Sequence, residues 1–273
     1  MDEKDFAAKE IINYTFEGTF GDKQIPVCRC EPYNFNGINV ILFHGVHSSA
    51  NLSHFNKFRV IANLLVKHGF RPWLVETSRK TRDRDLYHSN MGAWINAAFS
   101  GKIFSQERED DFRAYRKICE LTGDETKWLW GFSLGGIIAL SVAAGGADTE
   151  DFHSRPLDTL IISGTGMEAY PDECPYILKL PVLTTLTEEV DKNLAFKVRA
   201  NRLISFRGEH DEVFGEDKCI ELVNSIVNIP EEAKTYIPIP GADHALRHRN
   251  KIKAPEIMEE MLSHILNFCN MEA

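Results

Sequence analysis

The stretch Gly131-Phe132-Ser133-Leu134-Gly135 places a serine between two elements of different type. The aromatic-rich apolar run Trp128-Leu129-Trp130 before it predicts a strand, and the small-residue run 136–144 after it predicts a helix. A serine in so tight a turn takes a strained backbone conformation, which pushes its Oγ clear of the chain. Glycine suits positions 131 and 135, because a Cβ there would collide with the neighbouring strand or helix.

Outward from this turn, predicted strands and helices alternate in the manner of a largely parallel sheet covered by helices. Strands are predicted at 39–44, 70–76, 127–132, 158–163, 202–207 and 234–239, and helices at 54–68, 110–121, 136–144, 216–227 and 255–269. Two earlier strands, 14–20 and 24–31, flank Gly21-Asp22-Lys23 and predict a hairpin. We expect residues 1–273 to form a single α/β domain.

The amino-acid composition and net charge narrow the classes of protein to which this chain can belong. Of 273 residues, 43% are hydrophobic and 26% are charged, and the net charge is −9. The acidic balance argues against nucleic acid as a partner, because phosphate binding needs a basic surface. No apolar run approaches the roughly 20 residues that cross a bilayer, and no secretory signal is visible at the charged N-terminus. A cytoplasmic protein without a membrane span is expected, and the sequence does not indicate its oligomeric state.

Two segments, 78–109 and 167–200, interrupt the alternation of strands and helices. Each leaves the carboxyl end of a predicted strand, where open α/β sheets bind ligands. Connections of this length are often lids or binding loops, so both are candidate lid or cap excursions. Within the first, Trp94 and Phe99 belong to an apolar patch that either covers an acyl pocket or packs against the domain, and the pattern does not separate the two.

A serine hydroxyl is a weak nucleophile, so Ser133 would need a base, and the base would need an orienting acid. Asp211 and His244 follow Ser133 in the chain, each just past a predicted strand. The three residues are therefore expected to meet at the carboxyl edge of the sheet. The alternative for Ser133 is an inert turn serine, which its position between a strand and a helix disfavours.

Neighbouring titratable residues leave alternatives for the acid and the base. Glu209 and Glu212 lie beside Asp211, and His248 follows His244 by four positions. Sequence alone does not remove these alternatives, because the choice depends on which side chain points toward Ser133.

These pieces resemble the α/β-hydrolase family from about Tyr14 to Cys269. The resemblance lies in His44-Gly45 at the end of a strand, the Gly-Phe-Ser-Leu-Gly turn, Gly208-Glu209-His210-Asp211 and Gly241-Ala242-Asp243-His244. It implies the α/β-hydrolase fold, a mostly parallel central sheet flanked by helices with lid or cap insertions after two strands. It also implies serine-hydrolase chemistry that needs no metal and no organic cofactor.

The resemblance assigns roles to five residues. Ser133 is the nucleophile, His244 is the general acid and base, and Asp211 is the carboxylate that holds the imidazole. The backbone N–H groups of Leu134 and Val46 form the oxyanion hole. Each such donor stabilises the transition state by about 3 kcal/mol.

Three further residues are candidates for substrate binding: His44, Trp94 and Phe99. His44 precedes the serine and is interpreted as shaping the loop that carries Val46 rather than as a base. The basic run Arg79-Lys80-Thr81-Arg82-Asp83-Arg84 is interpreted as a solvated face of mixed charge. The alternative is a site for an anionic acyl group.

The expected activity is hydrolysis of carboxylic esters of small or medium acyl groups through an acyl-enzyme intermediate, with a small-molecule ester or thioester as partner. A thioesterase, an acyltransferase or some peptidases would use the same triad, and the two excursions decide among them. A non-catalytic binding protein on this fold is the alternative from a different class, since fold does not imply function.

Substitution of each histidine separates the two candidate bases. His244→Ala is expected to abolish ester turnover, because Ser133 then lacks a group to accept its proton, whereas His248→Ala is expected to leave most of it. Hydrolysis of a p-nitrophenyl ester by the purified variants measures both effects. The reverse pattern would identify His248 as the base.

Overall fold

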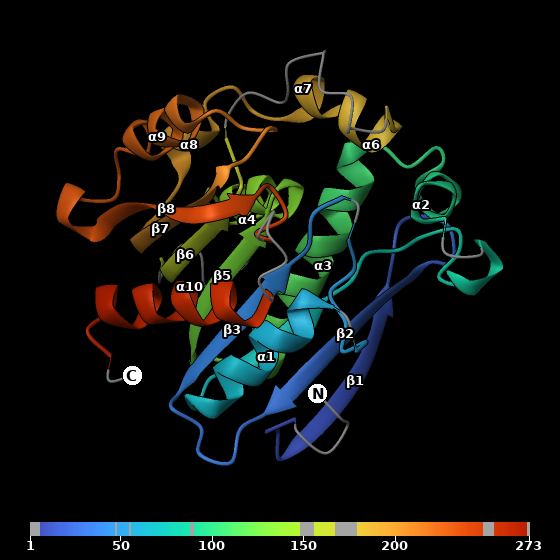
Figure 1. Cartoon of the computed structure of the whole chain (residues 1–273). Coiled ribbons are helices and arrows are strands. Elements are labelled where there is room, and N and C mark those ends of the chain that lie inside the picture. Colours follow the sequence, from blue (N-terminus) through green and yellow to red (C-terminus); the bar gives the residue numbers. More distant parts are fainter. Residues whose placement is uncertain are drawn as a thin grey trace.

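A computed structural model describes residues 6–46, 48–54, 56–87, 90–147, 156–166, 179–247 and 254–271. Within these ranges, eight strands form one sheet in the order β1-β2-β4-β3-β5-β6-β7-β8 (Figure 1). The pairs β1–β2 and β2–β4 are antiparallel, and all other neighbours are parallel. The prediction of a mostly parallel sheet preceded by a hairpin is therefore confirmed.

The elements have the following bounds. The strands are β1 Glu10–Glu17, β2 Gln24–Glu31, β3 Ile38–Phe43, β4 Arg71–Val75, β5 Thr126–Phe132, β6 Leu157–Ser163, β7 Ala200–His210 and β8 Lys234–Asp243. The longer helices are α1 Lys57–Lys67, α2 Met91–Phe99, α3 Phe104–Thr122, α4 Leu134–Ala143, α9 Glu216–Ser225 and α10 Ala254–Phe268. The short helices are η2 Asp85–Tyr87, α6 Pro181–Thr184, α7 Leu186–Glu189, α8 Leu194–Lys197 and η3 Glu231–Ala233.

Helices cover both faces of the sheet, as Figure 1 shows, with α1 and α10 on one side and α3 and α4 on the other. Trp130 belongs to the same buried cluster as Phe58 of α1, while its neighbour Leu129 belongs to the cluster that contains Ile138 of α4. Alternate residues of a strand point to opposite faces, so a strand covered on both sides reads as a continuous apolar run. No helix within the described ranges combines the length and the hydropathy that spanning a bilayer requires.

Side-chain hydrogen bonds set two element ends that differ from the prediction. β1 ends at Glu17 rather than at 20, because the Thr19 N–H and hydroxyl both donate to Asp110 Oδ1 and draw the chain off the sheet. α1 begins after Asn56 rather than at 54, because the Asn56 side chain accepts a hydrogen bond from the Phe58 N–H at 2.9 Å. This is the usual N-cap of a helix.

The predicted excursions contain more helix than their sequences indicate. α3 begins at Phe104 rather than at 110, and with η2 and α2 it occupies much of the 78–109 excursion. In the second excursion, 167–178 lie outside the described residues, and the remainder holds α6, α7 and α8. The start of α3 was missed because residues 105–109 have the polar sequence Ser-Gln-Glu-Arg-Glu, although Glu107 is only 1% exposed. That the excursions act as lids stays a prediction.

A buried ionic cluster lies at this end of α3. Lys102 Nζ is 2.8 Å from Asp110 Oδ2 and 2.5 Å from Glu107 Oε2. Burial opposes ionisation of Asp110, but the Lys102 ammonium and hydrogen bonds from Ser78 and Thr19 outweigh it and hold the pKa of Asp110 below its ordinary value of 3.8.

The neighbouring Asp111 has the opposite environment. Burial, reinforced by the charges of Glu107 and Asp110, raises the pKa of Asp111 well above 3.8. The folded protein therefore retains a proton on Asp111 that the unfolded chain releases above pH 3.8, so Asp111 reduces stability as the pH rises past that value. Asp110 does the reverse, since its ionised form stabilises the fold and that contribution is lost as pH falls through its lowered pKa.

Two adjacent substitutions should therefore have opposite effects on stability. Asp110→Asn is expected to lower the free energy of unfolding at pH 7 by about 3–5 kcal/mol, because it breaks a buried ion pair. Asp111→Asn is expected to raise it at pH 7, with the gain shrinking as the pH falls toward 4. Urea unfolding at pH 4 and pH 7 measures both. A loss of stability in Asp111→Asn at pH 7 would indicate that Asp111 is ionised in the folded protein.

Candidate active site

Ser133 occupies the turn between β5 and α4 with a left-handed backbone, φ 52° and ψ −116°. The chain crosses itself closely here. A Cβ on Gly131 would lie 2.2 Å from the Gly135 oxygen, and a Cβ on Gly135 would lie 2.6 Å from the His44 oxygen. Only glycine fits either position, so the strained conformation of Ser133 is enforced by its surroundings.

The structure brings Ser133, His244 and Asp211 into one hydrogen-bonded chain. His244 Nε2 is 3.1 Å from Ser133 Oγ, and His244 Nδ1 is 2.9 Å from Asp211 Oδ2. The Asp211 side chain is fully buried, whereas the His244 side chain is 26% exposed. A carboxylate only accepts hydrogen bonds, so the proton of the neutral ring stays on Nδ1 and Nε2 is left free to accept the proton of Ser133.

Asp211 is held in place by the loop that follows β7. Its Oδ1 accepts hydrogen bonds from the N–H groups of Val213 and Phe214 at 2.8 and 3.0 Å. Arg207 braces the same loop, donating to the oxygens of Phe214 and Asp211. Sequence reasoning did not single out Arg207, because an arginine at the end of a strand carries no signal of this role. The carboxylate therefore reaches His244 in a fixed orientation.

The alternatives to Asp211 and His244 lie elsewhere or outside the described residues. The exposed Glu209 accepts a hydrogen bond from the Gly241 N–H at 2.7 Å, which links the end of β7 to β8. Glu212 is exposed. His248 is not among the described residues. The catalytic roles of Ser133, Asp211 and His244 stay predictions that this geometry favours.

The two predicted oxyanion donors flank Ser133. Leu134 is the first residue of α4, so its N–H has no intrahelical acceptor and lies at the positive end of the helix dipole. On the other side, a Cβ on Gly45 would lie 3.2 Å from both Ser133 Cβ and the Phe132 oxygen. The loop that carries Val46 therefore packs against Ser133 at Gly45.

Known structures share this architecture, although no protein-family model and no curated protein sequence matches the chain. A thermostable carboxyl esterase from Bacillus coagulans matches with a TM-score of 0.65 at 15% identity, over 94% of this chain and 98% of the other. An α/β serine hydrolase homologue from Coxiella burnetii matches with a TM-score of 0.60 at 16% identity, over 94% and 98%. A lidless α/β serine hydrolase from Xanthomonas campestris matches with a TM-score of 0.58 at 14% identity, over 96% of this chain and 94% of the other. The chain has the α/β-hydrolase fold.

In this α/β-hydrolase fold, His44 lies at the end of β3 beneath the Val46 loop. Its ring is 2% exposed, with Nδ1 2.7 Å from the Gly45 oxygen and Nε2 3.0 Å from Arg79 Nη2. Burial and the Arg79 guanidinium lower the pKa of His44 to about 3. The imidazole is therefore neutral at physiological pH, and His44 contacts the protein backbone and Arg79.

The interpretation of residues 79–84 as a solvated face is wrong for Arg79, which is 1% exposed. Arg82 is half-buried and pairs with Asp22 and Glu76, at 2.7 Å each. Arg84 donates a hydrogen bond to the Ser49 hydroxyl. The charges of these arginines are directed to partners within the fold, which a sequence pattern of alternating charge does not reveal.

Trp94 and Phe99 of α2 also contact Arg79. They are at most 1% exposed, and their ring centroids lie 5.6 and 5.2 Å from the Arg79 guanidinium carbon. This is ordinary packing with cation–π character. Their predicted role in substrate binding stays a prediction.

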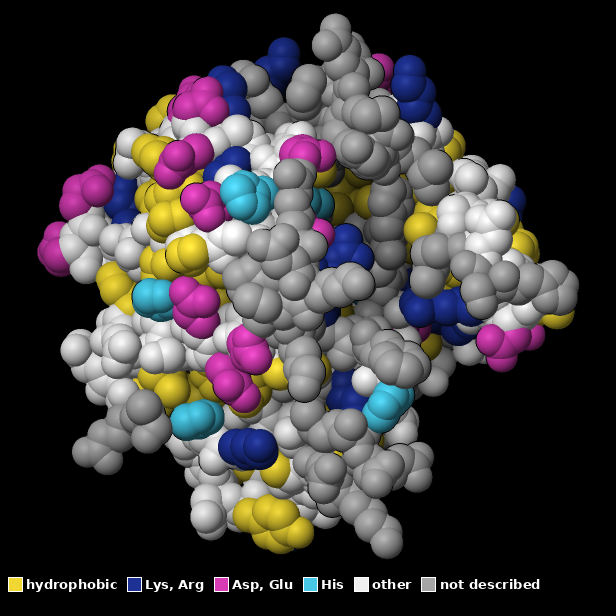
Figure 2. Space-filling model, viewed as in Figure 1, with side chains coloured by type: hydrophobic (Ala, Val, Ile, Leu, Met, Phe, Trp, Pro, Cys, Tyr) yellow, Lys and Arg dark blue, Asp and Glu magenta, His cyan; other side chains and the backbone are white. Residues whose placement is uncertain are grey.

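The surface of this fold is uneven in charge and shape. Figure 2 shows acidic side chains gathered over α9, β8 and α10, and a hollow near the centre of the view with hydrophobic side chains at its floor. Within the described ranges, no three His, Cys, Asp or Glu side chains are placed to share a metal ion.

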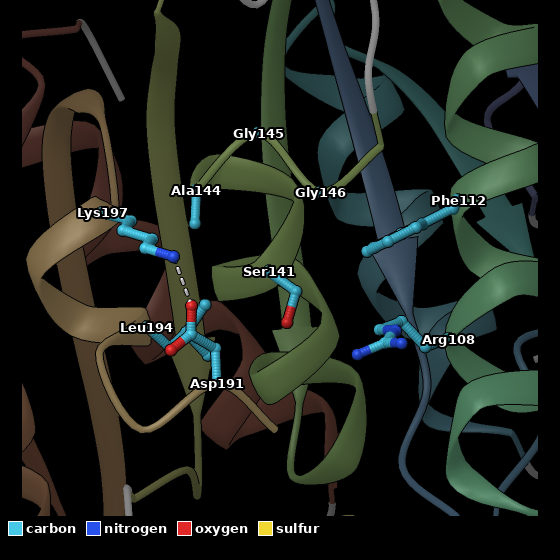
Figure 3. A pocket seen from close by; sticks show the side chains of 9 residues that line it. All are labelled: Arg108, Phe112, Ser141, Ala144, Gly145, Gly146, Asp191, Leu194 and Lys197. Atoms are coloured by element: carbon cyan, nitrogen blue, oxygen red, sulfur yellow. Dashed lines mark hydrogen bonds and ion pairs between the residues drawn. The ribbon is translucent and has the colours of Figure 1, made fainter. Parts of the chain in front are cut away.

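A separate cavity of about 340 Å³ lies at the C-terminal end of α4, the end remote from Ser133. Asp191 and Lys197 pair on one side of it, 2.5 Å apart, and Arg108 points into it from the other side (Figure 3). Ser133, Asp211 and His244 do not line this cavity, so it is distinct from the candidate active site.

Gly164, just after β6, offers a test of how closely His244 must be placed. Its φ is +58°, and a Cβ there would lie 3.2 Å from His244 Cε1 and Nδ1. Gly164→Ala is expected to lower kcat on a p-nitrophenyl ester by about 10- to 100-fold, because displacing the imidazole disturbs its alignment with Ser133.

Gly123→Ala is the matched control. Gly123 has φ +51°, and no neighbouring atom lies within 4 Å of an added Cβ. Gly123→Ala therefore introduces a backbone strain of about 1–2 kcal/mol, similar to that of Gly164→Ala, but no contact with His244. It should lose stability in urea unfolding and retain kcat. Equal activities of the two variants would show that the position of His244 tolerates this displacement.

Proposed function

We propose that this protein is a serine hydrolase that cleaves carboxylic esters of small or medium acyl groups through an acyl-enzyme intermediate. The observation that carries the proposal is the continuous chain from Ser133 Oγ through His244 to the buried Asp211. The similar structures include carboxyl esterases and serine hydrolases, which supports the proposal. Their sequence identities of 14–16% show a shared fold and not a shared activity.

Acylation begins when Ser133 Oγ attacks the ester carbonyl carbon and His244 Nε2 accepts the hydroxyl proton. The carbonyl π electrons move to oxygen, and the N–H groups of Leu134 and Val46 donate to the resulting oxyanion. When the intermediate collapses, the bond to the alcohol oxygen breaks and His244 returns the proton to that oxygen. Asp211 holds the imidazole in the orientation that both transfers need.

Deacylation repeats these steps with water in place of Ser133. Water attacks the acyl carbon while His244 Nε2 accepts one of its protons, and the same two N–H groups stabilise the second oxyanion. Collapse releases the carboxylic acid, and Ser133 Oγ takes the proton back from His244. The enzyme returns to its starting protonation state, with one ester and one water converted to an acid and an alcohol.

The charge distribution favours an uncharged acyl group. Arg79 and Arg82, which could have received an anionic acyl group, are directed to His44, Ser48, Asp22 and Glu76.

A fluorophosphonate probe tests the nucleophile directly. Wild-type protein should be labelled, and Ser133→Ala should not, because the probe phosphonylates an activated serine. Ser141→Ala is a matched control on the same helix, since the Ser141 hydroxyl donates to the Ile137 oxygen and lines the remote cavity. Absence of wild-type labelling, or equal labelling of Ser133→Ala, would favour a non-catalytic binding protein.

A panel of p-nitrophenyl esters and acyl-thioesters of increasing chain length then identifies the substrate class. An optimum among short and medium esters would support the proposal. Higher kcat/KM on thioesters would instead identify a thioesterase with the same triad.

A further inference from the structure

We propose that Arg79 is a positioning residue for the oxyanion loop, His44-Gly45-Val46, and that it acts through the His44 imidazole to aim the Val46 N–H at the developing oxyanion. This inference rests on the proposed function, since an oxyanion forms only if Ser133 attacks a carbonyl group. It assigns a purpose to a buried arginine that the triad chemistry itself does not use.

One guanidinium nitrogen reaches both sides of the oxyanion loop. Arg79 Nη2 lies 3.0 Å from His44 Nε2 and donates to the Ser48 oxygen at 3.2 Å. His44 is the first residue of the loop, and Ser48 lies just beyond its end. Arg79 therefore ties together the two ends of the segment that packs against Ser133 at Gly45.

The arginine also selects the tautomer of His44. A guanidinium is always protonated and only donates hydrogen bonds, so His44 Nε2 must be the acceptor. In the neutral ring the proton then lies on Nδ1, which donates to the Gly45 oxygen at 2.7 Å. The burial that lowers the pKa of His44 to about 3 keeps this arrangement in place across the physiological range.

The Gly45 oxygen and the Val46 N–H belong to the same peptide group. A trans peptide is planar, with its C=O and N–H directed to opposite sides, and the described residues contain no cis peptide. Holding the Gly45 oxygen toward His44 therefore turns the Val46 N–H away from His44. Arg79 orients the imidazole and binds Ser48, and the His44 Nδ1–H and the Ser48 N–H, at 2.7 and 3.1 Å, together hold the Gly45 oxygen. The direction of the Val46 N–H follows from this carbonyl group.

Arg79 is itself held rigidly by distant parts of the chain. Its backbone exchanges hydrogen bonds with Asp22 of the β1–β2 connection, and its guanidinium packs against Trp94 and Phe99. Arg79 Nε is buried without a hydrogen-bond partner among the described residues. A buried donor without a partner lowers stability. The side chain therefore binds His44 and Ser48 through Nη2 while its Nε is left without a hydrogen bond.

Two substitutions of Arg79 test the proposal by steady-state kinetics on the best ester of the panel. Arg79→Met should lower kcat about 100-fold with little change in KM, as expected when an oxyanion donor is misplaced. Arg79→Lys retains the charge but donates from a single point, so a smaller loss of about 10-fold is expected. Arg79→Lys also allows the proposal to be tested if Arg79→Met does not fold.

An inhibitor series separates positioning from general loss of structure. An aryl trifluoromethyl ketone forms an adduct with Ser133 that carries an oxyanion, so its Ki should rise in each variant in proportion to the fall in kcat/KM. Arg113→Gln is the matched control, because Arg113 pairs with Glu109 within α3 at 3.0 Å and not with Asp22 or the oxyanion loop. It should leave kcat and Ki unchanged, and circular dichroism should show native structure in all variants.

Nitrogen-15 NMR of the histidine side chains provides a readout that needs no turnover. Wild-type His44 should show a protonated Nδ1 and an unprotonated Nε2, and Arg79→Met should lose this single-tautomer signal. An Nε2-protonated His44 in the wild type, or folded Arg79 variants with wild-type kcat and Ki, would overturn the proposal. A wild type that neither labels nor turns over esters would overturn the proposed function itself, and with it the positioning role of Arg79.

Discussion

Close backbone contact at the β5–α4 turn is the constraint on which the candidate site depends. Gly131 and Gly135 leave no room for side chains, and the chain between them holds Ser133 at φ 52°. Such strain persists only where the surrounding structure enforces it, and here β3, β5 and α4 all contribute. The same crossing brings the end of β3 against the start of α4, so the serine and both predicted oxyanion donors are placed by one local geometry.

Buried charge is the second organising feature. Arg79, Lys102, Glu107 and Asp110 are each at most 1% exposed and lie between the oxyanion loop, α2 and α3. Buried ion pairs contribute little net stability, although removing one partner is strongly destabilising. Their effect here is to fix geometry, since they connect the β1–β2 hairpin and α2 to the loop beside Ser133. Parts of the chain that touch no predicted triad residue thereby influence its surroundings.

Much of the framework was predictable from the sequence, because it depends on local patterns. The parallel sheet follows from apolar runs, and the meeting of Ser133, Asp211 and His244 follows from their positions after strands. The environment of Arg79 was not predictable, since a charged run normally indicates a solvated face and its burial comes from contacts with Asp22 and α2, which are distant in sequence. The start of α3 was missed for a related reason: its first turn is polar in sequence, yet the charged Glu107 is buried there beside Phe104.

The late position of β8 in the chain has a consequence for the synthesis of the protein. His244, just after β8, meets Ser133 across 111 positions of the chain. A nascent chain emerging from the ribosome can form the serine turn before His244 has been synthesised, so the three predicted triad residues come together only after β8 has docked.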